Sequence, residues 1–117
     1  MIERGEIWPV SAGRRLGSGR SRSREVLVVQ CAELLQQKHP LTLVIPLSTD
    51  VVDDAEPLRI RVSAAGRLRQ DADLMIDQIF AIETARLVHG PLLRVDDALM
   101  ARVEDAMREI LGLLESG

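Results

Sequence analysis

The sequence is poor in the side chains on which most metal, redox and base-stacking sites depend. It has a single cysteine, Cys31, which excludes an internal disulfide bond, and it has only two histidines. A structural zinc site uses about four cysteine or histidine ligands, so the sequence argues against one. Tyrosine is absent, and Trp8 and Phe80 are the only aromatic residues. Any binding of nucleic acid would therefore depend on charge and hydrogen bonds more than on stacking of bases against aromatic rings.

Long apolar segments are also missing. No apolar run reaches the roughly 18 residues that a membrane-spanning helix needs, and residues 1–6 contain no apolar core of a signal peptide. We therefore expect a protein without a membrane segment that stays in the cytoplasm. The 117 residues fit one domain over residues 1–117, and a hydrophobic content of 46% is enough for a core.

Charge is distributed unevenly along the chain, although the formal net charge is only −3. Residues 13–24 read GRRLGSGRSRSR and contain five arginines and no acidic residue. Acidic residues gather later, around residues 53–56 and 71–73 and along the C-terminal segment. A local basic loop matters more for phosphate contacts than the sum over the chain, so the net negative charge does not exclude a nucleic-acid partner.

Five or six short stretches have the composition of β-strands. They are rich in β-branched and aliphatic residues, and segments with glycine, proline, serine or aspartate separate them. They cover residues 6–10, 25–30, 41–47, 58–62, 73–79 and 86–89. Pro9 restricts the first stretch to a sheet edge or a bulge, because proline has no amide hydrogen to donate.

Two segments have the composition of helices. Residues 31–38 allow two helical turns that end before Pro40, since the residue before a proline avoids the helical conformation. The last segment predicts an amphipathic helix, which either Asp96 or Asp97 can cap. Its apolar residues recur at the helical period: Leu99, Met100, Val103, Met107, Ile110, Leu111 and Leu114. Short strands with one long terminal helix predict an α+β domain around a curled antiparallel sheet.

Five short motifs, in order along nearly the whole chain, resemble the MazF/PemK family of toxins. They are RGEIW at residues 4–8, REVLVVQ at 24–30, PLST at 46–49, DQI at 77–79, and the helical segment at 100–113. The resemblance implies a small SH3-like antiparallel β-barrel with short helices and a C-terminal helix, paired as a homodimer. It also implies an mRNA interferase, an endoribonuclease that cleaves single-stranded RNA at short sequences without metal or other cofactor. A cognate MazE-like antitoxin is the implied partner that blocks the RNA groove.

The resemblance also implies catalytic residues. Arg24 matches the family's catalytic arginine, and Ser48 matches its catalytic threonine or serine. RNA can be cleaved by attack of its own 2′-hydroxyl on the adjacent phosphate, which needs a proton acceptor, a proton donor and positive charge beside the phosphorane. A guanidinium supplies that charge but is a poor base, so we assign Arg24 to transition-state stabilisation and leave open that it also donates a proton. The Ser48 hydroxyl can orient the phosphate, and the adjacent Thr49 can replace it. The alternative for both hydroxyls is a turn-forming Ser-Thr pair.

Further residues are candidates for binding RNA. The basic loop contributes Arg14, Arg15, Arg20 and Arg22 as candidate phosphate contacts, with a solvated run of charge as the alternative. Gln78 matches a family position near the RNA groove, although a glutamine at a strand end is often simply solvated.

The other polar residues are more consistent with structural roles. Histidine is a common acid or base in catalysis, but nothing in the sequence brings His39 and His89 together, and His89 sits in a strand pattern. The acidic residues at 53–54 and 71–73 could hold a hard cation but are more typical of solvated turns. Cys31 is more consistent with a small buried hydrophobic residue than with a nucleophile.

The sequence departs from the family pattern around the expected groove. Glu25 replaces the proline that usually follows the catalytic arginine, and residues 17–22 lack the acidic residue of the family's loop. Glu25 could accept the proton of the 2′-hydroxyl or could repel RNA. A homologue that binds RNA or antitoxin without cleavage therefore stays open as an alternative. A CcdB-like gyrase poison is disfavoured, since such toxins depend on a C-terminal aromatic tail and this sequence ends in LESG.

Overall fold

The structure is a computed structural model, and it describes residues 1–11 and 25–113. Within these residues the chain forms seven strands, two α-helices and two 3-10 turns. The strands are β1 (Glu6–Pro9), β2 (Glu25–Val28), β3 (Leu41–Ser48), β4 (Arg59–Val62), β5 (Ala72–Met75), β6 (Phe80–Glu83) and β7 (Leu93–Arg94). The helices are α1 (Ala32–Gln36) and α2 (Asp97–Ile110), and the 3-10 turns are η1 (Ile76–Gln78) and η2 (Thr84–Arg86).

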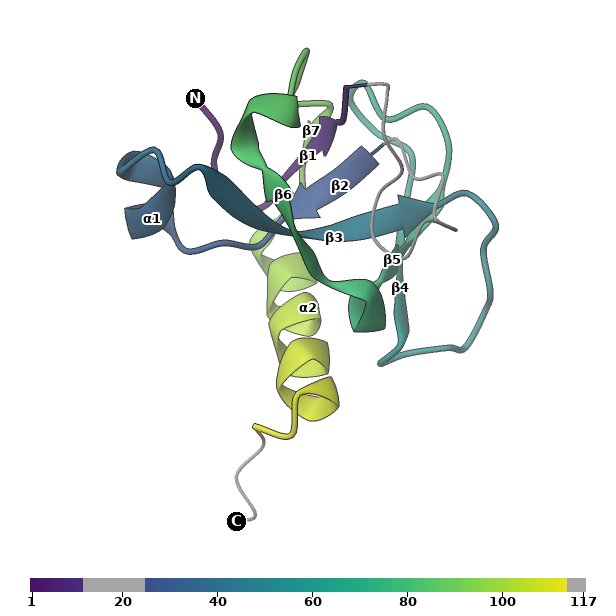
Figure 1. Cartoon of the computed structure of the whole chain (residues 1–117). Coiled ribbons are helices and arrows are strands. Elements are labelled where there is room, and N and C mark those ends of the chain that lie inside the picture. The colour runs from purple at the N-terminus through teal and green to yellow at the C-terminus, as the bar shows by residue number, and fades with distance from the viewer. Residues whose placement is uncertain (12–24, 114–117) are drawn as a thin grey trace.

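The sheet is antiparallel and is organised by its longest strand, β3 (Figure 1). The strands follow the order β4-β5-β3-β2-β1-β7, and β6 also pairs with β3. The first half of β3 pairs with β6 from Leu41 to Val44, and its last two residues pair with β5. One strand that changes partner along its length makes the sheet curl, as in a half-open barrel. The observed architecture confirms the predicted α+β class, with a curled antiparallel sheet and a C-terminal helix.

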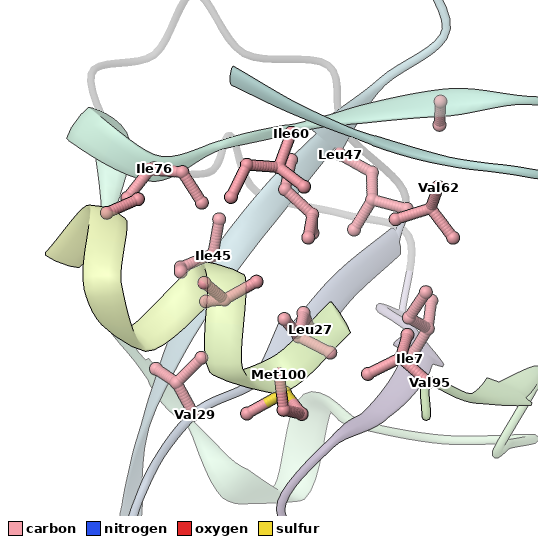
Figure 2. Close-up of a cluster of buried hydrophobic side chains, with 14 of the residues drawn as sticks. Ile7, Leu27, Val29, Ile45, Leu47, Ile60, Val62, Ile76, Val95 and Met100 are labelled. Carbon is pink, nitrogen blue, oxygen red and sulfur yellow. The ribbon is translucent and has the colours of Figure 1, made fainter. Parts of the chain in front are cut away.

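Apolar residues are buried on both faces of the central strands. In β2, Leu27 packs in the larger core, while its neighbours Val26 and Val28 pack in a second cluster on the opposite face, with Trp8 and Ile82. Successive side chains of a strand point to opposite faces, so a strand buried on both faces reads as a continuous apolar run. This explains the run EVLVVQ. Figure 2 shows the larger core, with side chains of the sheet gathered beneath α2.

Helix α2 closes the larger core. The side chain of Asp96 accepts a hydrogen bond from the amide of Leu99 at 2.8 Å, so Asp96, and not Asp97, caps the helix. Met100, Val103 and Ala106 recur every three residues and are the buried positions of the helix. No helix in the described part of the chain is long and apolar enough to span a membrane.

Some predicted strands have different limits. The stretch 73–79 is a strand only to Met75, because η1 follows and turns the chain from β5 towards β6. Residues 86–89 do not form a strand: η2 ends there, and Leu87 makes only an isolated bridge to Val10. β6 and β7 were not predicted, since strands this short give weak periodic signals. Pro9 does not lie in an edge strand, because β1 pairs with both β2 and β7. It is tolerated as the last residue of β1, beyond the two positions that pair with β7.

Candidate active site

The two candidate hydroxyls lie where β3 ends. Ser48 is the last residue of this strand and is half-buried, whereas the following residue, Thr49, is exposed. The Ser48 Oγ accepts a hydrogen bond from the amide of Asp50 at 3.1 Å. A hydroxyl has one proton to donate and two lone pairs, so Ser48 can make this bond and still donate to a phosphate oxygen.

The start of β2 lies beside this strand end. Val26 is the register partner of Pro46, so the antiparallel pairing brings the beginning of β2 next to the end of β3. Glu25, the first residue of β2, is half-buried there. The candidate residues Arg14, Arg15, Arg20, Arg22 and Arg24 lie outside the described residues.

Gln78 does not share this location. It is exposed at the end of η1, between β5, which pairs with the end of β3, and β6, which pairs with its first half. Gln78 therefore lies alongside the middle of β3 and not at the strand end that carries Ser48.

A buried carboxylate stands next to Ser48 in the sheet. Asp73, the register partner of Ser48, is 1% exposed. Its carboxylate accepts hydrogen bonds from the side chain of Arg61 and from the amide of Val52, the latter at 2.7 Å, and Arg59 is 3.6 Å away. The expectation of a solvated turn at residues 71–73 is therefore wrong for Asp73, because β4 supplies two arginines that compensate its charge in the sheet.

These contacts determine the protonation state of Asp73. Burial by itself raises the pKa of the carboxyl group, but the hydrogen bonds from Arg61 and Val52 and the charges of Arg61 and Arg59 outweigh it. The pKa of Asp73 is consequently lower than its usual value. Asp73 also raises the pKa of Arg61 through the hydrogen bond between them, and the hydrogen bond of Arg61 to Asp53 raises it further. The group is thus a fixed ion pair and not a proton carrier at neutral pH.

A pocket of about 580 Å³ lies against this ion-pair group. Its lining includes Arg59, Arg61 and Asp73 from the sheet, and Arg102 from α2. Arg102 is paired with Glu56 at 2.7 Å, so its charge is compensated as well. The lining carries four carboxylates and three guanidinium groups, so the pocket is slightly acidic and differs from an open basic groove.

The structure also tests the predictions for the cysteine, for one histidine and for a metal site. Cys31 is exposed just before α1, so the expectation of a buried hydrophobic residue is wrong. His89 has a φ of 62° in a turn, where a strand conformation is impossible. No group of three or more Cys, His, Asp or Glu side chains with the geometry of a metal site occurs within residues 1–11 and 25–113.

The sequence did not predict that three polar residues align across the sheet. These are Ser48, Asp73 and Arg61, which are register partners on adjacent strands. The alternation in residues 58–62 does place Arg59 and Arg61 on one face of a strand. However, the partner strands were unknown, so nothing connected that face with Ser48.

Comparisons with known proteins identify the family. The family model of PemK-like, MazF-like toxins of type II toxin-antitoxin systems matches residues 3–111. Endoribonuclease MazF9 of Mycobacterium tuberculosis is 29% identical over 118 residues, which cover 97% of this chain and 98% of that protein.

Solved structures agree on the fold. Mycobacterium tuberculosis toxin MazF-mt6 has a TM-score of 0.73 at 16% identity, with 94% of this chain and 99% of that chain covered. An endoribonuclease from Mycobacterial species, solved in complex with its cognate antitoxin, has a TM-score of 0.72 at 16% identity, with 98% and 99% covered. Since the family model spans nearly the whole sequence, this chain belongs to the PemK-like, MazF-like toxins of type II toxin-antitoxin systems.

Proposed function

We propose that this toxin is a sequence-specific, metal-independent endoribonuclease that cleaves single-stranded RNA, with Arg24 and Ser48 at its active site. The family match over residues 3–111 carries the proposal, and MazF9, which matches almost end to end, is an endoribonuclease by name. The fold also supports the proposal. Ser48 lies at the end of β3, beside the start of β2, and β2 continues the sequence motif that contains Arg24.

The reaction transfers the phosphate within the RNA. The 2′-hydroxyl oxygen attacks the adjacent phosphorus and the P–O5′ bond breaks, which leaves a 2′,3′-cyclic phosphate and a 5′-hydroxyl. The Arg24 guanidinium stabilises the charge of the phosphorane, and the Ser48 hydroxyl orients a phosphate oxygen, with Thr49 as the substitute hydroxyl. The carboxylate of Glu25 is the candidate acceptor for the proton of the 2′-hydroxyl, and the Arg24 guanidinium donates a proton to the leaving 5′ oxygen.

The basic loop contributes binding energy. Arg14, Arg15, Arg20 and Arg22 contact phosphates, and Gln78 contacts RNA farther along β3. Each lost phosphate contact on a single strand reduces the log–log salt slope of the binding constant by about 0.7. Replacing one loop arginine with alanine should therefore flatten the slope by that amount, while Gln78→Ala should change the affinity without changing the slope.

The decisive experiment is cleavage of a long single-stranded RNA by purified protein in EDTA, with mapped product ends. We expect cuts at a recurrent short sequence with 5′-hydroxyl ends, and loss of these cuts in Arg24→Ala. Ser48→Ala and Thr49→Ala, assayed separately, identify the hydroxyl that acts, and Glu25→Gln tests the proton acceptor. Absence of cuts from correctly folded protein would contradict the proposal.

The natural partner is a MazE-like antitoxin. An endoribonuclease from Mycobacterial species with the same fold has been solved in complex with its cognate antitoxin. An antitoxin with an acidic and apolar tail would cover the basic loop and the neighbouring strand ends. Addition of the antitoxin in equimolar amount should abolish cleavage, and the complex should dissociate at high salt if charge dominates the contact.

The toxin forms a homodimer in the cytoplasm, where its RNA substrate is found. Support comes from an apolar patch that we define as Leu41 and Leu43, which are both 43% exposed and lie two positions apart on the same face of β3. A second copy of the chain would cover such a patch by two-fold symmetry. Sedimentation should show a dimer at micromolar concentration. Leu43→Glu should shift it to monomer, whereas Leu58→Glu, at a position 50% exposed outside the patch, should not.

One alternative function has a specific observation in its favour. Glu25 places a carboxylate at the strand ends that would face the RNA phosphates, which suits a homologue that binds antitoxin or RNA without cleavage. If Glu25→Pro, the family's usual residue, gained cleavage that the natural protein lacks, this alternative would be correct.

A further inference from the structure

Three polar side chains stand in one row across three adjacent strands. Ser48 in β3 is the register partner of Asp73 in β5, and Asp73 is the partner of Arg61 in β4. Residues directly opposite each other on antiparallel strands project to the same face of the sheet. The neighbouring positions, such as Leu74, point into the core beneath α2, so the row occupies the opposite face.

The row holds the segment that follows Ser48. We call residues 50–56, between β3 and β4, the strap. Arg59 donates to the carbonyl oxygen of Asp50 at 2.9 Å, and the amide of Val52 donates to Asp73 Oδ2 at 2.7 Å. Arg61 donates to Asp53 Oδ1 at 2.8 Å while its Nε donates to Asp73 Oδ1. The strap is thus attached to β4 and β5 at three of its first four residues.

The same strap orients Ser48. The amide of Asp50 donates to the Ser48 Oγ at 3.1 Å, and the carbonyl of that residue is held by Arg59. The amide that orients the Ser48 hydroxyl therefore belongs to a residue of the strap, so a displaced strap would change the orientation of this hydroxyl. Asp73 is the central residue of the row. One of its carboxylate oxygens accepts a hydrogen bond from the strap, and the other accepts one from Arg61.

We propose that Asp73 and Arg61 are positioning residues for RNA cleavage, which hold the strap so that the Ser48 hydroxyl is presented to the phosphate in one orientation. This inference rests on the proposed function. Neither residue touches the reacting atoms in this mechanism. Their contribution is preorganisation, for which a displacement of about 1 Å can cost as much as 100-fold in rate.

The test compares two variants of the row with a matched control. In Asp73→Asn the side chain keeps one acceptor oxygen and gains an NH2 group. Either Val52 or Arg61 then faces this NH2 group, so one of their two hydrogen bonds to residue 73 is lost. Arg61→Lys keeps the charge but loses the planar fork that joins Asp73 and Asp53. Asp105→Asn is the control, because it removes a carboxylate paired with an arginine at 2.8 Å on the exposed side of α2.

The readout is the kinetics of cleavage of an oligoribonucleotide that contains the site mapped for the natural protein. We expect Asp73→Asn to lower kcat by about 10- to 100-fold with KM within about two-fold, and Arg61→Lys to change kcat in the same direction. Asp105→Asn should keep the natural kcat. In a Ser48→Ala background, Asp73→Asn should have no further effect on kcat, since the hydroxyl that it positions is gone.

Amide hydrogen exchange gives an independent readout. The amides of Asp50 and Val52 should exchange at least about 10-fold faster in Asp73→Asn than in Asp105→Asn, while the amides of α2 stay protected. Natural kcat in both row variants, or a fall in kcat that persists in the Ser48→Ala background, would overturn the positioning role while leaving the ribonuclease intact. If the natural protein cuts no RNA, the proposed function itself fails. Should Asp73→Asn not fold, Arg61→Lys, at a site one-third exposed, decides the question.

Discussion

Two leucines with the same chemistry and different burial allow a quantitative test of the packing described above. Leu27 in β2 is 0% exposed and belongs to the core beneath α2, whereas Leu43 in β3 is 43% exposed. Replacing Leu27 with alanine removes buried apolar surface and leaves a cavity that the surrounding sheet can only partly fill. Such changes cost about 2–5 kcal/mol, and we expect about 3 kcal/mol at this fully buried position. For a domain of this size the loss corresponds to a fall in Tm of roughly 12 °C.

Leu43→Ala should cost less than about 1 kcal/mol in the monomer, since much of the side chain is already in water and no closed cavity forms. The assay is urea denaturation followed by circular dichroism, with the m-value compared among the three proteins to confirm an unchanged unfolding transition. Measurements at two protein concentrations separate the intrinsic effect from coupling to dimer formation, because only the latter varies with concentration. Equal free energies of unfolding for the two variants at low concentration would refute the assignment of Leu27 to a packed core.

Two further predictions concern single carboxylates. The pKa of Asp73 is lowered by folding, so its ionised form stabilises the protein above the unfolded pKa of about 4, and this contribution is lost as the pH falls through the folded pKa. Urea titrations between about pH 2 and 7 should therefore show a steeper acid loss of stability in the natural protein than in Asp73→Asn, and parallel curves would contradict this. Asp96→Ala removes the cap of α2 and should cost about 1 kcal/mol, whereas Asp97→Ala, one residue into the helix, should cost much less; similar losses in the two variants would argue against Asp96 as the cap.

The local elements that depend on neighbouring residues were predictable. The period of Met100 and Val103 and the aspartates before them are sufficient to predict a capped helix packed on one side. The apolar run of β2 likewise predicts a buried strand. Burial on both faces of a sheet requires apolar side chains at consecutive positions. The resemblance then located Ser48, and the structure puts it at the end of β3 as the strand pattern implied.

The arrangement of the site required the tertiary structure. Strand register is set by pairing between residues far apart in sequence, and one residue of slippage would move Asp73 to the core face. The sequence alone therefore suggested a solvated turn for a carboxylate that is buried, paired with Arg61 and aligned with Ser48. Likewise, η1 looks like the continuation of a strand until the change of partner from β5 to β6 along β3 is known. The sequence by itself determined the family, the fold class and the candidate hydroxyl, because these depend on local pattern and motif order. Only the tertiary structure decided which charges surround that hydroxyl, because long-range pairing brings them together.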